Sequence, residues 1–179
     1  MKYLIVVDIE ATCWKGWEHA EEMETIEIGA VKLNQNFEDA GQFTTFVKPV
    51  IHPQLSDFCV NFTSIQQADV DQADLFPAAF DKFLAWIGED AYLWFSWSSY
   101  DAKRLHDDLV YHSQPIPKFF DNHHDLKKLY AQKEGLKERV GMRRALKNLK
   151  IDYSGRQHRA LDDALNTAHI LRYVLKQNG

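Results

Sequence analysis

The chain has 179 residues, 45% hydrophobic and 26% charged, and this composition excludes an intrinsically disordered protein. Its length is typical of one domain, so we expect a single domain over residues 1–179. The net charge of −5 argues against a protein that coats nucleic acid through bulk electrostatics.

Four strands are predicted from runs of apolar and β-branched residues. The first, Tyr3 to Ile9, is almost continuously apolar, which is typical of a central strand buried on both faces. Thr25 to Leu33 and Gln42 to Val47 are joined by a polar turn around Asn34 to Asp39, and we expect them to form a meander with the first strand. Tyr92 to Trp97 is the fourth.

Helical periodicity predicts five helices, of which the last is the longest and most periodic. They are expected at about Pro77 to Ile87, Tyr100 to Tyr111, Asp125 to Gln132, Met142 to Leu149 and Arg159 to Leu175. Three leading strands followed by strand and helix units indicate an α/β fold. We expect a mixed central sheet of about five strands, three antiparallel and then parallel, flanked by helices.

Asp8 and Glu10 are two residues apart at the end of the first predicted strand. Side chains with this spacing project from the same face, so the two carboxylates should lie together at the carboxyl end of the strand. Oxygen ligands of this kind suit Mg²⁺ or Mn²⁺, and open α/β sheets bind ligands beyond the carboxyl ends of their strands. The alternative is that one carboxylate caps a turn and the other is solvated.

Asp101 follows the predicted strand Tyr92 to Trp97. If that strand is a neighbour of the first, Asp101 can face the same crevice as Asp8. Ser98 and Asp101 also have the spacing of a capping box, so the alternative is that Asp101 caps the helix it begins.

Asp162 and Asp163 are adjacent at the start of the last predicted helix and cannot share a face. Asp163 aligns with Thr167, Ile170 and Val174 in a largely apolar stripe, so we expect it to point inward and Asp162 to point outward. A carboxylate directed into a core is costly unless it is paired or bound to a metal. Asp163 is therefore a further candidate metal ligand, and pairing with a buried arginine is the alternative.

His158 precedes Asp163 by five residues and follows a loop that contains glycine. A histidine with a pKa near neutrality can take a proton from a metal-bound water, although a lone histidine is more often exposed or structural. His123 and His124 are expected to be solvated or capping. The sequence contains no HExxH motif or Cys/His cluster that would suggest zinc.

Three motifs together resemble those of the DEDDh 3′→5′ exonuclease family, which has an RNase H-like fold. They are DIEAT from Asp8, SSYD ending at Asp101, and HRALDD from His158 to Asp163, and the similarity spans nearly the whole chain. The stretches FVKP, LSDFC and FTSIQQADVD resemble the Eri1-like and KapD-like branch, which favours RNA as the substrate. The superfamily's tyrosine variant would have Tyr where Arg159 stands, so the histidine subtype is indicated.

The resemblance implies a single exonuclease domain that uses two Mg²⁺ or Mn²⁺ ions on single-stranded RNA or DNA 3′ ends and releases 5′-mononucleotides. By position, Asp8 would bridge the two ions, Glu10 and Asp163 would complete the first site, and Asp101 would support the second. His158 would be the general base. Two metals roughly 3.5–4 Å apart can stabilise both the attacking and the leaving oxygen of an in-line displacement.

The resemblance also implies a set of residues that hold the terminal nucleotide: Ala11, Thr12, Phe58, Thr63, Ser64, Ile65 and Tyr100. Backbone groups near Ala11 and Thr12 and a loop from Thr63 to Ile65 would serve this purpose. Phe58 and Tyr100 are candidates for base stacking, with core packing as the alternative.

Two departures from the family pattern affect the predicted nucleotide site. Ser64 replaces a common glycine, and SSYD differs from the Asn-containing second motif of many relatives. We therefore expect a shifted preference for the terminal nucleotide.

The charge is distributed unevenly along the chain. Residues 1–110 carry 7 Lys or Arg against 19 Asp or Glu, whereas residues 111–179 carry 14 against 7. This fits a phosphate-binding surface beside a carboxylate site that attracts cations, although exposed helix faces alone often produce such runs.

Other segments bear on location and on access to the site. The apolar run Leu4 to Val7 is too short for a signal peptide or membrane span, so we expect a cytoplasmic protein without a membrane partner. Cys13 and Cys59 are too few for a disulfide framework and are predicted to be small hydrophobic residues. The segment Cys13 to Met23, with Trp14 and Trp17, is predicted to be a mobile loop that either gates the substrate or covers hydrophobic surface.

Two functions compete with exonuclease activity. One is a catalytically inactive nucleic-acid-binding adaptor on the same fold, against which the intact set of five residues argues. The other is an RNase H-like endonuclease, which His158 disfavours.

Overall fold

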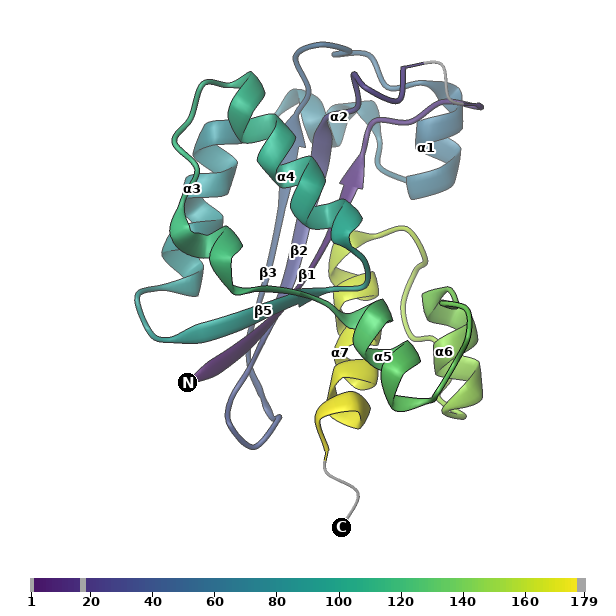
Figure 1. Cartoon of the computed structure of the whole chain (residues 1–179). Coiled ribbons are helices and arrows are strands. Elements are labelled where there is room, and N and C mark those ends of the chain that lie inside the picture. The colour runs from purple at the N-terminus through teal and green to yellow at the C-terminus, as the bar shows by residue number, and fades with distance from the viewer. Residues whose placement is uncertain (1, 17–18, 177–179) are drawn as a thin grey trace.

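A six-stranded mixed sheet forms the centre of the computed structural model, which describes residues 2–16 and 19–176 (Figure 1). Its strands are β1 (Tyr3–Ala11), β2 (Thr25–Leu33), β3 (Asp39–Lys48), β4 (Asp74–Leu75), β5 (Tyr92–Ser96) and β6 (His123–Asp125), in the order β4-β3-β2-β1-β5-β6. β1, β2 and β3 are antiparallel, whereas β5 is parallel to β1 and β6 is parallel to β5. The predicted mixed sheet is confirmed.

Helices cover both faces of this sheet (Figure 1). They are α1 (Asp57–Thr63), α2 (Gln67–Asp71), α3 (Phe76–Ile87), α4 (Ser99–Tyr111), α5 (Leu126–Lys133), α6 (Met142–Asn148) and α7 (Ala160–Leu175), with a 3₁₀ turn η1 (Lys118–Asn122). The five predicted helices are present within one or two residues of their expected bounds. No helix in the described part of the chain is both long enough and apolar enough to span a membrane.

The alternation of side chains along β1 determines which face carries the carboxylates. Ile5 and Val7 point into the core beneath α3 and α4, whereas Leu4 and Val6 pack against α5, α6 and α7. Burial on both faces explains the continuous apolar run. Because side chains alternate with a period of two, Asp8 continues the even-numbered face and points toward α7.

Several short elements were missed or misassigned from the sequence. The sheet has six strands rather than about five, because β4 has two residues and β6 has three, too short for a detectable pattern. Of the two alternatives for His123, capping is confirmed, because its backbone N–H donates to the Phe120 carbonyl at the end of η1, whereas a solvated side chain is wrong. His123 is half-buried in β6, where its ring contacts Trp94 and bonds to Ser96 at 2.9 Å.

Helix α1 was also missed, because its seven residues are too few to show helical periodicity. Ser56 begins it by accepting a hydrogen bond from the Cys59 N–H at 3.0 Å. Cys59 is buried in the small core that α1 covers, and Cys13 packs against that core. Both cysteines therefore pack as small hydrophobic residues, as predicted.

Candidate active site

Asp8 and Glu10 lie at the carboxyl end of β1, in the middle of the sheet. In the antiparallel pairing with β2, Asp8 is opposite Gly29 and Glu10 is opposite Glu27. Glu10 is 7% exposed and Glu27 is 1% exposed, so three acidic residues crowd one largely buried stretch of the sheet.

Asp101 lies in the first turn of α4, just after β5, and β5 is the parallel neighbour of β1. Ser98 caps α4 by accepting a hydrogen bond from the Tyr100 N–H at 3.3 Å. Asp101 does not complete a capping box. Its Oδ1 instead accepts the Ile9 N–H at 3.3 Å, which places the buried carboxylate between Asp8 and Glu10 along the strand. The capping alternative for Asp101 is therefore wrong.

Helix α7 brings Asp163 to the site because its first turn rests directly on β2. A Cβ built at Gly29 would lie 2.2 Å from both the Ala160 carbonyl carbon and the Leu161 nitrogen, so only glycine permits this approach. Glu27 fastens the same turn by accepting the Ala160 N–H at 3.0 Å and by pairing with Arg159 at 2.8 Å. The start of α7 is thus fixed opposite Asp8.

Replacing Gly29 by Ala is expected to damage both stability and activity. The added methyl group must push the backbone of α7 away from β2, and overpacking of this kind costs about 1–3 kcal/mol of folding free energy. A displacement of roughly 1 Å at a catalytic group can lower the rate by about 10²-fold. Chemical denaturation and nuclease assays test this.

The matched control for Gly29→Ala is Gly141→Ala, because a Cβ at Gly141 meets no atom of the described residues within 4 Å. Unchanged activity of Gly29→Ala would show that the position of α7 does not determine the geometry of the site.

Asp163 points into the site and is 5% exposed. It accepts hydrogen bonds from the Tyr153 hydroxyl at 2.7 Å and from the His158 N–H at 3.1 Å. The predicted alternative, pairing with a buried arginine, is wrong, because Arg159 pairs with Glu27 instead. Asp162 is half-exposed on the other side of the helix and accepts the Arg156 N–H at 2.8 Å.

The backbone conformation of His158 and a stacking contact with an aromatic side chain determine where its ring lies. Its φ of 61° lies in the left-handed region, and its ring stacks on Phe62 with 3.8 Å between centroids. Ligand atoms of Glu10, His158 and Asp163 all lie within 4.8 Å of one another. Burial lowers the pKa of His158 below its ordinary value, so the ring is neutral and able to accept a proton at neutral pH.

The electrostatics of the four carboxylates are unfavourable without a cation. Burial, reinforced by the charges of Asp101, Glu10 and Asp163, raises the pKa of Asp8 well above its ordinary range. Burial likewise raises the pKa of Glu10 to about 9 and that of Asp101 to about 7. Glu27 has Arg159 to neutralise it, but within residues 2–16 and 19–176 no ion pair involves Asp8, Glu10, Asp101 or Asp163. The oxygen donors and unbalanced charge fit divalent cations.

The raised pKa values predict how stability depends on pH and metal. Without divalent ions, Glu10 and Asp101 keep protons that the unfolded chain releases, so the free energy of unfolding should fall as pH rises from about 4 to 9. Bound Mg²⁺ favours the ionised carboxylates and should offset this fall. The increase in Tm caused by Mg²⁺ is therefore expected to grow with pH, which thermal melts across this range will show. An increase that is equal at every pH would contradict the electrostatic argument.

The aromatic residues predicted to stack on bases lie at the surface. Phe58 is 39% exposed and Tyr100 is 46% exposed, so the alternative of core packing is wrong for both. Phe62 was not predicted. It is 44% exposed and stacks between Phe58, at 5.5 Å, and His158. Its spacing of four residues from Phe58 is a signal that only becomes informative once α1 is recognised as a helix.

The polar groups predicted to hold the terminal nucleotide are largely used within the protein. The Thr12 N–H donates to the Glu24 carbonyl at 2.9 Å, and its hydroxyl accepts the Glu24 N–H at the same distance. Thr63 ends α1 rather than starting a loop, and its hydroxyl donates to the Cys59 carbonyl at 2.9 Å.

The remaining residues of that predicted set differ in exposure. Ala11 and Ile65 are buried. Ser64 is half-buried and has a φ of 67°, a left-handed conformation that explains why glycine is favoured there. These residues can therefore offer a terminal nucleotide a shaped surface and backbone groups, but few free side-chain hydrogen-bond donors.

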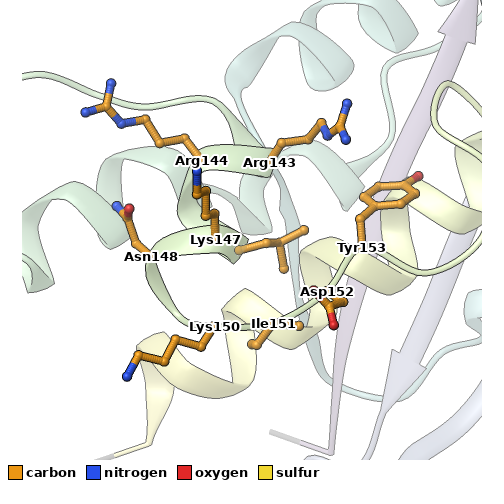
Figure 2. A pocket seen from close by; sticks show the side chains of 9 residues that line it. Arg143, Arg144, Lys147, Asn148, Lys150, Ile151, Asp152 and Tyr153 are labelled. Carbon is orange, nitrogen blue, oxygen red and sulfur yellow. The ribbon is translucent and has the colours of Figure 1, made fainter.

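A basic pocket of about 810 Å³ lies beside the carboxylates. Figure 2 shows its side chains projecting from α6 and from the segment that follows it. Four cationic residues and a single acidic one line it: Arg143, Arg144, Lys147, Lys150 and Asp152. Tyr153 also lines it and donates to Asp163, which connects the pocket to the site. In the described chain no ion pair involves Arg144, Lys147 or Lys150.

A mixed sheet with carboxylates gathered at the end of its central strand is the arrangement of an exonuclease, and comparison with known proteins identifies the family. Residues 5–171 match the family model described as Exonuclease. The nuclease domain of 3′hExo, a DEDDh family member, bound to rAMP, superposes with a TM-score of 0.88 at 32% identity, covering 97% of this chain and 92% of that one. The chain belongs to the DEDDh exonuclease family, whose members are typically metal-dependent.

Other relatives belong to the same branch. The 3′-5′ exoribonuclease 1 of Homo sapiens is 32% identical over 183 residues, which is 97% of this chain and 52% of that protein. The ERI1 exoribonuclease 2 of Xenopus laevis is 32% identical over 94% of this chain and 28% of its own length. The chain thus spans about half or less of these relatives. An exonuclease structure that describes 3′-end-specific recognition of a histone mRNA stem-loop has a TM-score of 0.91 at 31% identity, covering 97% of this chain and 63% of that one.

Proposed function

We propose that this protein is a divalent-metal-dependent 3′→5′ exonuclease that acts on RNA 3′ ends and releases 5′-mononucleotides. The observation that carries the proposal is the convergence beside His158 of four carboxylates that form no ion pair with any described residue. Because the similar proteins are named exoribonucleases, we favour RNA over DNA as the substrate of this protein.

Asp8, Glu10, Asp101 and Asp163 would hold two Mg²⁺ or Mn²⁺ ions. When bound, the ions would supply Lewis acidity for a phosphoryl displacement. His158 would accept the proton of the attacking water at its unprotonated ring nitrogen, since burial keeps the ring neutral. Asp163 positions the backbone of His158 through the His158 N–H, and Phe62 packs against its ring. No protein nucleophile is required.

The basic pocket supports a role for the nucleotides upstream of the terminal one. Its unpaired cations can bind a phosphodiester backbone whose 3′ end lies in the carboxylate site. Phe58 and Tyr100 are exposed aromatic faces on which bases can stack.

Neutralising one cation of the pocket, Lys147→Gln, is expected to weaken binding of single-stranded RNA and to reduce its dependence on salt. Each lost phosphate contact lowers the slope of log KM against log salt concentration by roughly 0.7. Hydrolysis of a dinucleotide should change little, because its single phosphodiester is the one cleaved at the carboxylates and no upstream phosphate remains for the pocket. Steady-state kinetics over a range of salt concentrations measure both effects.

The control for Lys147→Gln is Lys118→Gln, an exposed lysine at the start of η1. If log KM depends on salt concentration equally in the two variants, the pocket does not bind the RNA substrate.

The proposed activity is tested by digesting 5′-end-labelled single-stranded RNA, stem-loop RNA, single-stranded DNA and dinucleotides with Mg²⁺ or Mn²⁺. We expect stepwise loss of 3′ nucleotides, fastest on RNA. Folded protein that binds RNA without turnover would favour the inactive adaptor. Internal cuts in circular or 3′-blocked RNA would favour an endonuclease. The cytoplasmic location stays a prediction.

A further inference from the structure

A second group of metal-ligating side chains lies outside the carboxylate site. Glu22 Oε2 is contacted by His19 Nδ1 at 3.0 Å and by His52 Nε2 at 2.7 Å. The ligand atoms of these three residues all lie within 4.8 Å of one another. Two imidazole nitrogens and a carboxylate oxygen thus converge from two segments of chain, before β2 and after β3.

The segment after β3 is firmly anchored. Glu24 is 4% exposed, and its carboxylate accepts the N–H groups of Val50, Ile51 and His52 at 2.6, 2.8 and 2.9 Å. A buried carboxylate with three backbone donors fixes the backbone at His52. The position from which the His52 side chain projects is therefore fixed as well.

The imidazole rings are oriented by packing against a tryptophan. Trp14 contacts His19 at 4.9 Å and His52 at 4.8 Å between ring centroids, and the two histidine rings are 4.8 Å apart. Trp14 belongs to the segment predicted to be a loop that gates the substrate or covers hydrophobic surface. The second tryptophan of that segment, Trp17, lies outside the described residues. The rings are therefore held where their nitrogens point at one oxygen.

We propose that His19, Glu22 and His52 form a second metal site, which binds one transition-metal ion of the Zn²⁺ class. Imidazole nitrogen with one carboxylate suits Zn²⁺, whereas the all-oxygen carboxylate site suits Mg²⁺ or Mn²⁺. Zinc bonds of about 2.0–2.2 Å in a tetrahedral arrangement place ligand atoms roughly 3.3 Å apart. Relative to Glu22 Oε2, the nitrogens at 3.0 and 2.7 Å would move outward by roughly 0.3–0.6 Å to admit the ion, which leaves a fourth position for water.

The sequence gives no sign of this site because its ligands do not form a motif. His52 is thirty-three positions after His19, and the two meet only because β2 and β3 form an antiparallel pair. A bound ion would join the segment that follows Asp8 and Glu10 to the anchored segment at His52. It would act as a clasp that holds this loop beside the carboxylate site without taking part in the reaction.

Zinc binding is measured by equilibrium dialysis of the Asp8→Asn variant in excess Mg²⁺, so that binding at the carboxylates does not contribute. We expect one Zn²⁺ per chain. Loss of an outer partner of a metal ligand already lowers affinity by roughly 10–100-fold, so His19→Ala and His52→Ala should each lower it at least as much. Co²⁺ at the intact site should give the visible absorption of a tetrahedral complex.

The matched control is His169→Ala, which removes an exposed histidine from α7. A second readout is trypsin cleavage at Lys15, an exposed residue of the clasped segment. Zn²⁺ should slow this cleavage severalfold in the protein with His19 and His52 intact and have no effect in His19→Ala.

Three results would overturn the proposal: no bound Zn²⁺, equal affinity in His19→Ala and the control, or cleavage that does not respond to Zn²⁺. Because no readout requires RNA hydrolysis, failure of the site is distinguishable from failure of the proposed exonuclease activity.

Discussion

Asp8→Asn is expected to lower kcat by at least about 10³-fold while raising the Tm measured without divalent ions. A bound ion stabilises transition-state charge by several kcal/mol, and each 1.36 kcal/mol corresponds to about a factor of ten in rate. Asn keeps the size of Asp8 but removes the charge that the two ions would share. The same charge is disfavoured by burial and by Asp101, Glu10 and Asp163, so its removal should stabilise the metal-free fold.

The two effects of Asp8→Asn separate a role in catalysis from a role in folding. Thermal melts with and without Mg²⁺ should show that the variant is the more stable protein without Mg²⁺ and gains less from it. Single-turnover hydrolysis of labelled RNA measures the rate loss. Full activity in Asp8→Asn, or a lower Tm without metal, would show that Asp8 is not a ligand of the proposed metal ions.

Much of the candidate site could be predicted from the sequence because local periodicity fixes side-chain direction. The strand period of two places Asp8 and Glu10 on one face, and helical phase turns Asp163 inward. The orientation of Asp101 depends on whether two strands are neighbours. The parallel pairing of β1 with β5 supplies that adjacency, which no local pattern contains.

The residues that support the site were not predicted, because their roles depend on contacts between distant segments. Gly29 matters only because α7 packs on β2 at that point, and Glu27 only because Arg159 reaches it from 132 residues away. The hydrogen bond from the Tyr153 hydroxyl to Asp163 is likewise not indicated by any local sequence pattern. A buried glutamate within the apolar strand Thr25 to Leu33 was nevertheless a signal, since such a charge needs a partner.

His158→Ala is expected to lower kcat by about 10²–10⁴-fold, the usual contribution of a general base. The folded protein and its metal affinity should change little, because Asp163 receives the backbone N–H of residue 158 rather than its ring. Phe62 loses a stacking partner but remains at the surface. The loss should therefore fall on kcat more than on KM.

The dependence of rate on pH distinguishes a base from a structural residue. In the wild type, kcat should rise with pH through a pKa below the ordinary value for histidine, because burial favours the neutral ring. His158→Ala should lack this rise, and added imidazole should restore part of the rate. His169→Ala, which removes an exposed histidine from the same helix that carries Asp163, should keep the wild-type profile. An unchanged pH profile in His158→Ala would mean that another group accepts the proton of the attacking water.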